Sequence, residues 1–152
     1  MWITGKRAFA RAIEIALIVL MALAAVLTVT LPWSIPLVTI HRPGTDGWYE
    51  KYLLVLAVSG VLAELILWQA HGLMRNVIHS RAFSANTVRR LRVMGGLCLV
   101  QAAFYFVAVF TVTRFFMVAV FVTFAVVGLV LLVLAELFAQ AVAYKNENDR
   151  TV

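Results

Sequence analysis

Four polar side chains that need an explanation lie in the long apolar stretches of this chain of 152 residues or directly beside them: Glu14, Glu64, Gln101 and Glu136. A carboxylate in hydrocarbon is unfavourable unless it is paired or protonated, so such residues normally face other helices or a functional cavity. Glu64 follows Tyr52 by about 18 Å of helix, at about 1.5 Å per residue, which places it near the middle of a bilayer. We expect Gln101 within a turn or two of the same depth.

The Glu64 carboxyl group has two interpretations. When protonated, it would donate a hydrogen bond to Gln101 and hold the helices together without any further function. Alternatively, it would belong to a proton-coupled or ligand-coupled site of a small transporter or sensor. Glu136 lies nearer the end of its apolar stretch, and we expect it to form an ion pair with the arginines of residues 89–92 on the neighbouring antiparallel helix.

Residue types that perform catalysis or bind cofactors form no recognisable arrangement in the sequence. No two histidines are placed at matching depth within the spans, as a haem or metal site would need. Cys98 is the only cysteine, which excludes an intrachain disulfide. No Gly-rich phosphate loop or nucleophile–base motif is present. We therefore expect a protein that is not an enzyme and that has neither a cofactor nor a metal site.

The elements that position these residues are apolar stretches at 12–31, 52–73 and 93–135. A helical span needs about 20 apolar residues, so the first two stretches are one span each. As a single helix at about 1.5 Å per residue, the third would far exceed a bilayer core of roughly 30 Å. It must fold back, and we expect the turn at 111–114. The sequence predicts one domain with four spans, at about 12–31, 52–73, 93–111 and 116–138.

Proline and polar residues predict where these helices end. Pro32 and Pro36 are expected to end the first helix at Leu31. A loop from Pro32 to about Trp48 would follow, with a short extended segment at 37–40. The last helix is expected to reach about Ala143 and to be followed by a polar tail at 144–152.

The distribution of basic residues indicates the orientation in the membrane. With four spans, ten lysines and arginines lie on one side and three on the other, and this bias places the richer side in the cytoplasm. Both termini and the loop at 75–92 are then cytoplasmic. We expect an all-α integral membrane protein, with four transmembrane helices in an antiparallel bundle. The ten residues on the cytoplasmic side are Lys6, Arg7, Arg11, Arg75, Arg81, Arg89, Arg90, Arg92, Lys145 and Arg150.

The end of the loop at 75–92 has the pattern of a helix start. Ser84 is expected to cap the helix, with Phe83 and Val88 at the positions that fix its entry angle. The arginines at 89, 90 and 92 then lie in the first turns, where cations oppose the helix dipole. They need a compensating partner, such as phospholipid headgroups, a carboxylate or another protein. Inside the membrane, Gly95 and Gly96 would allow another helix to approach closely.

Two segments carry a resemblance to a known family. The loop sequence Phe83-Ser84-Ala-Asn86-Thr-Val-Arg89-Arg90-Leu91-Arg92-Val-Met-Gly95 is similar to the inner-loop motif of the DUF2975 membrane proteins. Leu134-Ala135-Glu136-Leu-Phe138, followed by Glu147-Asn148-Asp149-Arg-Thr151-Val152, resembles the C-terminus of that family. With matching span order, the resemblance covers essentially the whole chain. The departures are Ala82 for a proline, Ala141 for a glycine and Arg150 for an apolar residue; Ala141 suggests that the last helix continues further.

The resemblance implies context and no established activity. Members of that family are often encoded beside a small helix-turn-helix regulator, which implies a membrane protein that tethers or inactivates a DNA-binding partner without binding nucleic acid itself. The site would lie in the bacterial cytoplasmic membrane, on its cytoplasmic face. Its expected residues are Phe83, Ser84, Asn86, Arg89, Arg90, Arg92, Glu147, Asn148 and Asp149.

Three other interpretations stay open. The loop and the tail would pair only with each other and with lipid, which would fix the topology alone. In a second interpretation, the chain is a transporter or ligand-sensing module that uses Glu64. In a third, it is an accessory subunit of a larger membrane complex.

Overall fold

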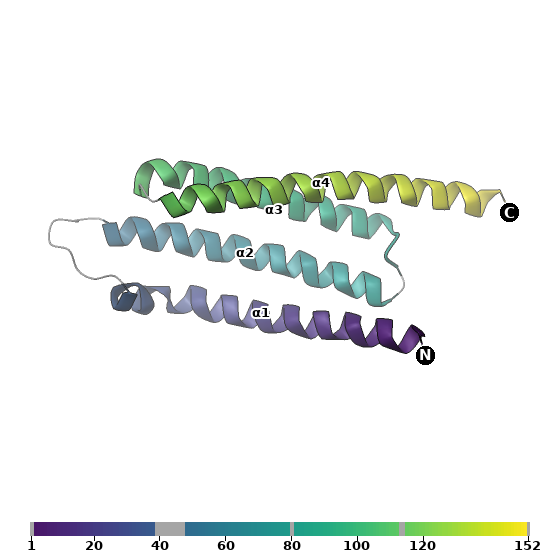
Figure 1. Cartoon of the computed structure of the whole chain (residues 1–152), viewed down its shortest axis with the longest axis horizontal. Coiled ribbons are helices and arrows are strands. Elements are labelled where there is room, and N and C mark those ends of the chain that lie inside the picture. Colours follow the sequence, from purple (N-terminus) through teal and green to yellow (C-terminus); the bar gives the residue numbers. More distant parts are fainter. Residues whose placement is uncertain (1, 39–47, 80, 113–114, 152) are drawn as a thin grey trace.

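Four long α-helices make up almost all of the described structure. The computed structural model describes residues 2–38, 48–79, 81–112 and 115–151. The helices are α1 (Trp2–Val38), α2 (Trp48–Ile78), α3 (Ala85–Val112) and α4 (Phe115–Arg150), and they lie side by side (Figure 1). The described ranges contain no β-strand. The prediction of an all-α protein with four helices is therefore confirmed.

The helices pack in the order of the chain. α1 contacts α2, α2 contacts α3, and α3 contacts α4, whereas the described residues of α1 make no comparable contact with α3 or α4. The two marked ends of the chain lie at the same end of the molecule as the end of α2 and the start of α3 (Figure 1). We call this end of the molecule the arginine end, because Arg75, Arg81 and the arginines at 89–92 lie there.

All four helices are long and apolar enough to cross a membrane. The candidate spans are Ala8–Ser34, Tyr49–Ile78, Ala85–Thr111 and Phe115–Arg150. Large apolar side chains cover the outside of the molecule, and Ile18, Val107 and Leu129 are each half or more exposed. A soluble protein rarely exposes apolar surface on this scale, whereas a bilayer covers it. The fold is that of a multi-pass membrane protein.

The first helix runs through both of its prolines. Pro36 has no N–H to donate to the carbonyl of Pro32, four residues earlier. The hydroxyl of Tyr49, at the start of α2, donates to that carbonyl at 2.9 Å. Membrane helices tolerate proline where a neighbouring group satisfies the freed carbonyl in this way. The prediction that the helix ends at Leu31 is therefore wrong, as is an extended segment at 37 and 38; residues 39–47 lie outside the described residues.

The longest apolar stretch is divided between two helices near the predicted turn at 111–114, of which residues 113 and 114 lie outside the described residues. α3 ends at Val112 and α4 begins at Phe115. A Cβ atom on Gly95 would lie 3.1 Å from the carbonyl oxygen of Gly128, and one on Gly128 would lie 3.1 Å from that of Gly95. The close approach predicted at Gly95 is confirmed, and Gly128 is its counterpart on α4. A Cβ on Gly96 would meet no atom within 4 Å, so Gly96 takes no part in this contact.

The last helix is longer than its apolar segment. α4 continues to Arg150, so the boundary predicted near Ala143 is wrong. The continuation agrees with the expectation raised by Ala141 in place of glycine. At the arginine end, α4 projects beyond the other three helices (Figure 1). The tail residues are therefore presented on a helix rather than on a flexible segment.

Candidate functional site

Hydrogen bonds at the start of α3 fix the path of the chain between α2 and α3. The backbone N–H of Thr87 donates to Ser84 Oγ at 3.3 Å, and the backbone N–H of Val88 donates to the Ser84 carbonyl at 3.3 Å. The first bond satisfies an N–H group that a helix start leaves free, and the second is the first backbone bond of the helix, so the predicted Ser84 cap is confirmed. The cap fixes where the first turn of α3 begins and therefore which way its arginines point.

Thr87 ties this cap to α2. Its side chain is 2% exposed. Thr87 Oγ1 accepts a hydrogen bond from Asn76 Nδ2 at 3.3 Å and donates to the Arg81 carbonyl at 3.3 Å. It also lies 3.1 Å from Ser84 Oγ. Sequence reasoning missed Thr87, because a threonine beside a capping serine has no pattern that distinguishes it from an exposed residue.

The arginines of α3 are divided between two sides of the helix. Successive residues are rotated by about 100°, so positions 89 and 92 share a face that position 90 does not. Arg89 and Arg92 line a groove between α3 and α4, whereas Arg90 lines a pocket between α2 and α3. The predicted cluster therefore forms two separate sites.

The α3–α4 groove is mostly apolar and has a volume of about 360 Å³. Arg92 Nη2 lies 3.3 Å from Glu136 Oε2, and the two side chains are 57% and 64% exposed. The predicted ion pair of Glu136 is thus confirmed, although such exposed pairs contribute little to stability. Arg89 is exposed and has no carboxylate partner among the described residues. Besides the two arginines, the residues that line the groove are Ala85, Val88, Val93, Ala139 and Val142.

Phe83 and Asn86 are within two positions of Ala85 in the sequence, and Ala85 lines this groove. The Phe83 ring stacks on the ring of Phe138 of α4, with centroids 5.4 Å apart and an interplanar angle of 19°. Phe83 is still half exposed, and Asn86 is exposed. Phe83 therefore adds an aromatic surface between α3 and α4 that the helix-entry pattern did not predict.

The predicted tail residues do not join the loop residues. Glu147, Asn148 and Asp149 are exposed on the last turns of α4. Val142, the last residue that lines the groove on α4, precedes Glu147 by five positions, which corresponds to about 7.5 Å of helix at about 1.5 Å per residue. Neither tail carboxylate forms an ion pair with an arginine within the described residues. The tail and the groove are thus adjacent surfaces rather than one site.

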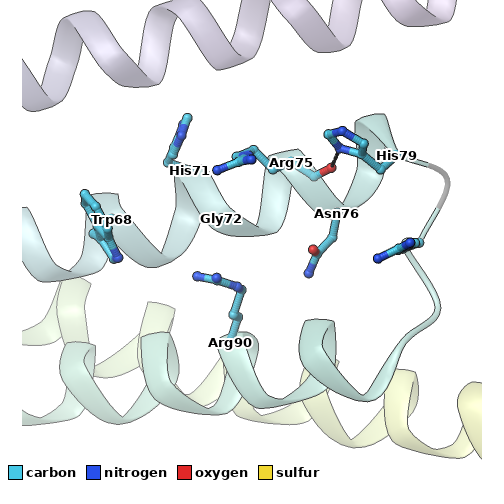
Figure 2. Close-up of a pocket in the computed structure, with 8 residues that line it drawn as sticks. Trp68, His71, Gly72, Arg75, Asn76, His79 and Arg90 are labelled. Carbon is cyan, nitrogen blue, oxygen red and sulfur yellow. Dashed lines mark hydrogen bonds between the residues drawn. The ribbon is translucent and has the colours of Figure 1, made fainter.

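The pocket between α2 and α3 is strongly basic, and we call it the basic pocket. It has a volume of about 350 Å³. Figure 2 shows Arg90 reaching from α3 toward α2 beside Gly72, and Asn76 reaching from α2 toward α3. A Cβ on Gly72 would overlap the Arg90 guanidinium, so a glycine there leaves the space that this group fills. The lining residues are Trp68, His71, Gly72, Arg75, Asn76, His79, Arg81 and Arg90.

The intramembrane polar groups are arranged differently from the prediction. Gln101 is 1% exposed, and its Nε2 donates to Ser59 Oγ, which lies 2.7 Å from Tyr105 Oη. Glu64 Oε1 is buried and has no hydrogen-bond partner among the described residues. The predicted bond between Glu64 and Gln101 is therefore wrong. Ser59 precedes Glu64 by five residues, so Gln101 lies about 7.5 Å from the expected depth along α2.

Two further features concern metals and thiols. Within the described residues, no group of three or more His, Cys, Asp or Glu side chains could hold a metal ion. Cys98 is 2% exposed and lies in the middle of α3, where it packs as a small apolar side chain.

The four helices define a class of protein, a multi-pass membrane protein, and the described residues form a groove and a pocket at its arginine end. Comparison with known sequences gives the family. The chain belongs to the family described as "Protein of unknown function (DUF2975)", whose sequence pattern matches residues 15–152. No curated protein and no solved structure matches the chain.

Proposed function

We propose that the protein is a non-enzymatic membrane protein that binds another protein at its cytoplasmic face. The partner we propose is a small helix-turn-helix transcription regulator, which the membrane protein would tether or inactivate. The proposal includes an antiparallel arrangement in the bacterial cytoplasmic membrane with both termini in the cytoplasm. The bias of basic residues supports that orientation, because the arginine end would face the cytoplasm.

The observation that carries the proposal is the α3–α4 groove with the unpaired Arg89 beside it. Its lining combines apolar side chains with a free cation, and it lies between two helices. A helix that presents apolar residues to a groove is a common mode of recognition between proteins. A partner helix with an apolar face and a carboxylate opposite Arg89 would fit this surface.

The projecting end of α4 supports a protein partner in a second way. Its exposed Glu147 and Asp149 have no ion-pair partner within the described residues. The interpretation in which the loop and the tail neutralise each other therefore has no support from their arrangement. A partner in the groove would be within reach of these carboxylates, since α4 continues directly from the groove to the tail.

The test is a mild-detergent pull-down of the tagged protein from its native host, followed by mass spectrometry. The Arg89→Glu variant reverses the charge at the groove. The control is Arg11→Glu, which makes the same change at an exposed position of α1. We expect a small helix-turn-helix protein with the wild type and with the control, and its loss with Arg89→Glu. Recovery of the same proteins with all three would overturn the proposal.

A second candidate function rests on Glu64. Its buried, unpartnered Oε1 is unusual, because buried polar atoms are nearly always hydrogen-bonded. A proton-coupled or ligand-coupled site would leave such a group free for its substrate. Glu64→Gln would then abolish uptake or response. A purely structural side chain would tolerate glutamine, which has a similar shape.

A further inference from the structure

The basic pocket contains positive charge without a counter-charge. Arg75, Arg81 and Arg90 line it together with His71 and His79, and no Asp or Glu is among its lining residues in the described part of the chain. The described residues contain one ion pair, between Arg92 and Glu136, and it lies on the other side of α3. Cations in one pocket without a carboxylate repel each other, so this arrangement favours an anion from outside the chain.

The pocket also contains a polar atom that has no partner among the described residues. Arg90 Nε is buried and forms no hydrogen bond there, whereas the His71 ring points toward α1 and away from Arg90 (Figure 2). Arg90 Nη1 donates to Gln69 Oε1 at 3.1 Å, which holds the guanidinium in place over Gly72. A buried donor without a partner is unfavourable by about 1–3 kcal/mol, so such groups normally have a ligand or water. The guanidinium is therefore already positioned, with a donor still free.

These features together specify the chemistry of the ligand. Several guanidinium groups with an amide donor nearby match the oxygens of a phosphate group, which arginine binds through paired charged hydrogen bonds. A volume of about 350 Å³ exceeds the needs of a single small ion and lies at the lower end of small-molecule pockets, about 300–1,000 Å³.

The position of the pocket favours a phospholipid as the source of the phosphate. The pocket lies between two membrane-crossing helices at the arginine end, and basic pockets of this kind bind anionic lipid headgroups. Trp68 lines it and is 62% exposed. An exposed indole at this place suits the interface between headgroups and acyl chains. We infer that the basic pocket binds a phosphate group, presented by an anionic phospholipid headgroup or by a soluble phosphate.

The test uses the purified full-length protein in a neutral detergent, with native mass spectrometry as the readout. The probes are phosphatidylglycerol, zwitterionic phosphatidylcholine and, separately, inorganic phosphate. Arg90→Gln removes the central guanidinium. Gly72→Ala keeps every charge, but its added Cβ displaces that guanidinium. This variant therefore tests the basic pocket if Arg90→Gln does not fold. The matched control is Arg89→Gln, the same change one residue away but in the α3–α4 groove.

We expect phosphatidylglycerol to bind in preference to phosphatidylcholine. Arg90→Gln should weaken this binding by about tenfold, because a charged hydrogen bond to phosphate is lost, and Arg89→Gln should leave it unchanged. Binding of inorganic phosphate with the same dependence on Arg90, and no preference between the lipids, would support the site and assign it to a soluble ligand. The inference is overturned if no probe binds, or if Arg89→Gln and Arg90→Gln have equal effects.

Discussion

Arg89 and Arg90 are adjacent in the chain, yet they line different cavities. Arg89 lines the α3–α4 groove, and Arg90 lies over Gly72 of α2 in the basic pocket. The helix rotates by about 100° between them, and the Ser84 cap fixes where that rotation starts. Substitution of all the loop arginines at once would therefore change two surfaces together. Separate substitutions at 89 and 90 distinguish protein binding in the groove from phosphate binding in the pocket.

Alanine substitutions at Gly95 and Gly96 allow the effect of packing to be measured, because both change the helix propensity by the same amount. Alanine is the better helix former at both positions by about 1 kcal/mol. At Gly95 the added Cβ would lie 2.9 Å from Leu132 and 3.1 Å from the Gly128 carbonyl oxygen, whereas at Gly96 it would meet open space. We expect Gly95→Ala to destabilise the protein by about 1–3 kcal/mol relative to Gly96→Ala. Thermal unfolding in detergent measures the difference, and equal stabilities would contradict the close contact of α3 and α4.

Thr87 is expected to stabilise the connection between α2 and α3 through its hydroxyl group. Thr87→Val keeps the shape but leaves Asn76 Nδ2 and the Arg81 carbonyl without this partner. The expected loss in the free energy of unfolding is about 1–3 kcal/mol. Thr87→Ser, which keeps the hydroxyl, is the control. Hydrogen exchange of the amides at 81–88 should rise in the valine variant, and unchanged protection would mean that the connection does not depend on Thr87.

The number of helices was predictable from the lengths of the apolar stretches, but the residues at which the helices end were not. The apolar stretch at 93–135 is too long for one span, so a turn near 111–114 follows from the thickness of a bilayer. The end of α1 depends on whether another group satisfies the carbonyl that Pro36 leaves free. That group is the hydroxyl of Tyr49, 17 positions beyond Pro32 in the sequence. A contact between two helices cannot be derived from the sequence of either one.

Some contacts of the candidate-site residues were predictable from the sequence, and others were not. Sequence patterns identified the Ser84 cap and the ion pair of Glu136, because the cap depends on local spacing and the ion pair on two helices that follow each other in the chain and are in contact. The predicted pairing of Glu64 with Gln101 was wrong because the depth of each residue in the membrane was counted separately along its own helix. The structure matches Gln101 with Ser59, so an error of little more than one turn was enough to assign the wrong partner.

The ion pair between Arg92 and Glu136 is expected to be weak. Both side chains are more than half exposed, so solvent and salt screen the attraction. A double-mutant cycle with Arg92→Ala and Glu136→Ala should give a coupling energy of about 0.2–1 kcal/mol that falls as salt is added. A larger coupling that is insensitive to salt would indicate that lipid or a partner protein shields this pair.

Ser59 is expected to matter more for stability than Gln101, although Gln101 is the larger and more deeply buried side chain. The Ser59 hydroxyl contacts both Gln101 Nε2 and Tyr105 Oη, and Gln101 Oε1 has no partner in the described part of the chain. Ser59→Ala would leave Gln101 Nε2 and Tyr105 Oη without this partner, with an expected loss of about 1–3 kcal/mol for each group that finds no other. Gln101→Leu removes the unpaired oxygen together with the amide and leaves the bond between Ser59 and Tyr105 intact, so it should be nearly neutral.

Unfolding of the two variants in the same detergent compares them directly. A greater loss for Gln101→Leu would show that the amide is held by an interaction at Oε1, such as a buried water or a lipid group, and that this end of the network is where α2 and α3 are joined.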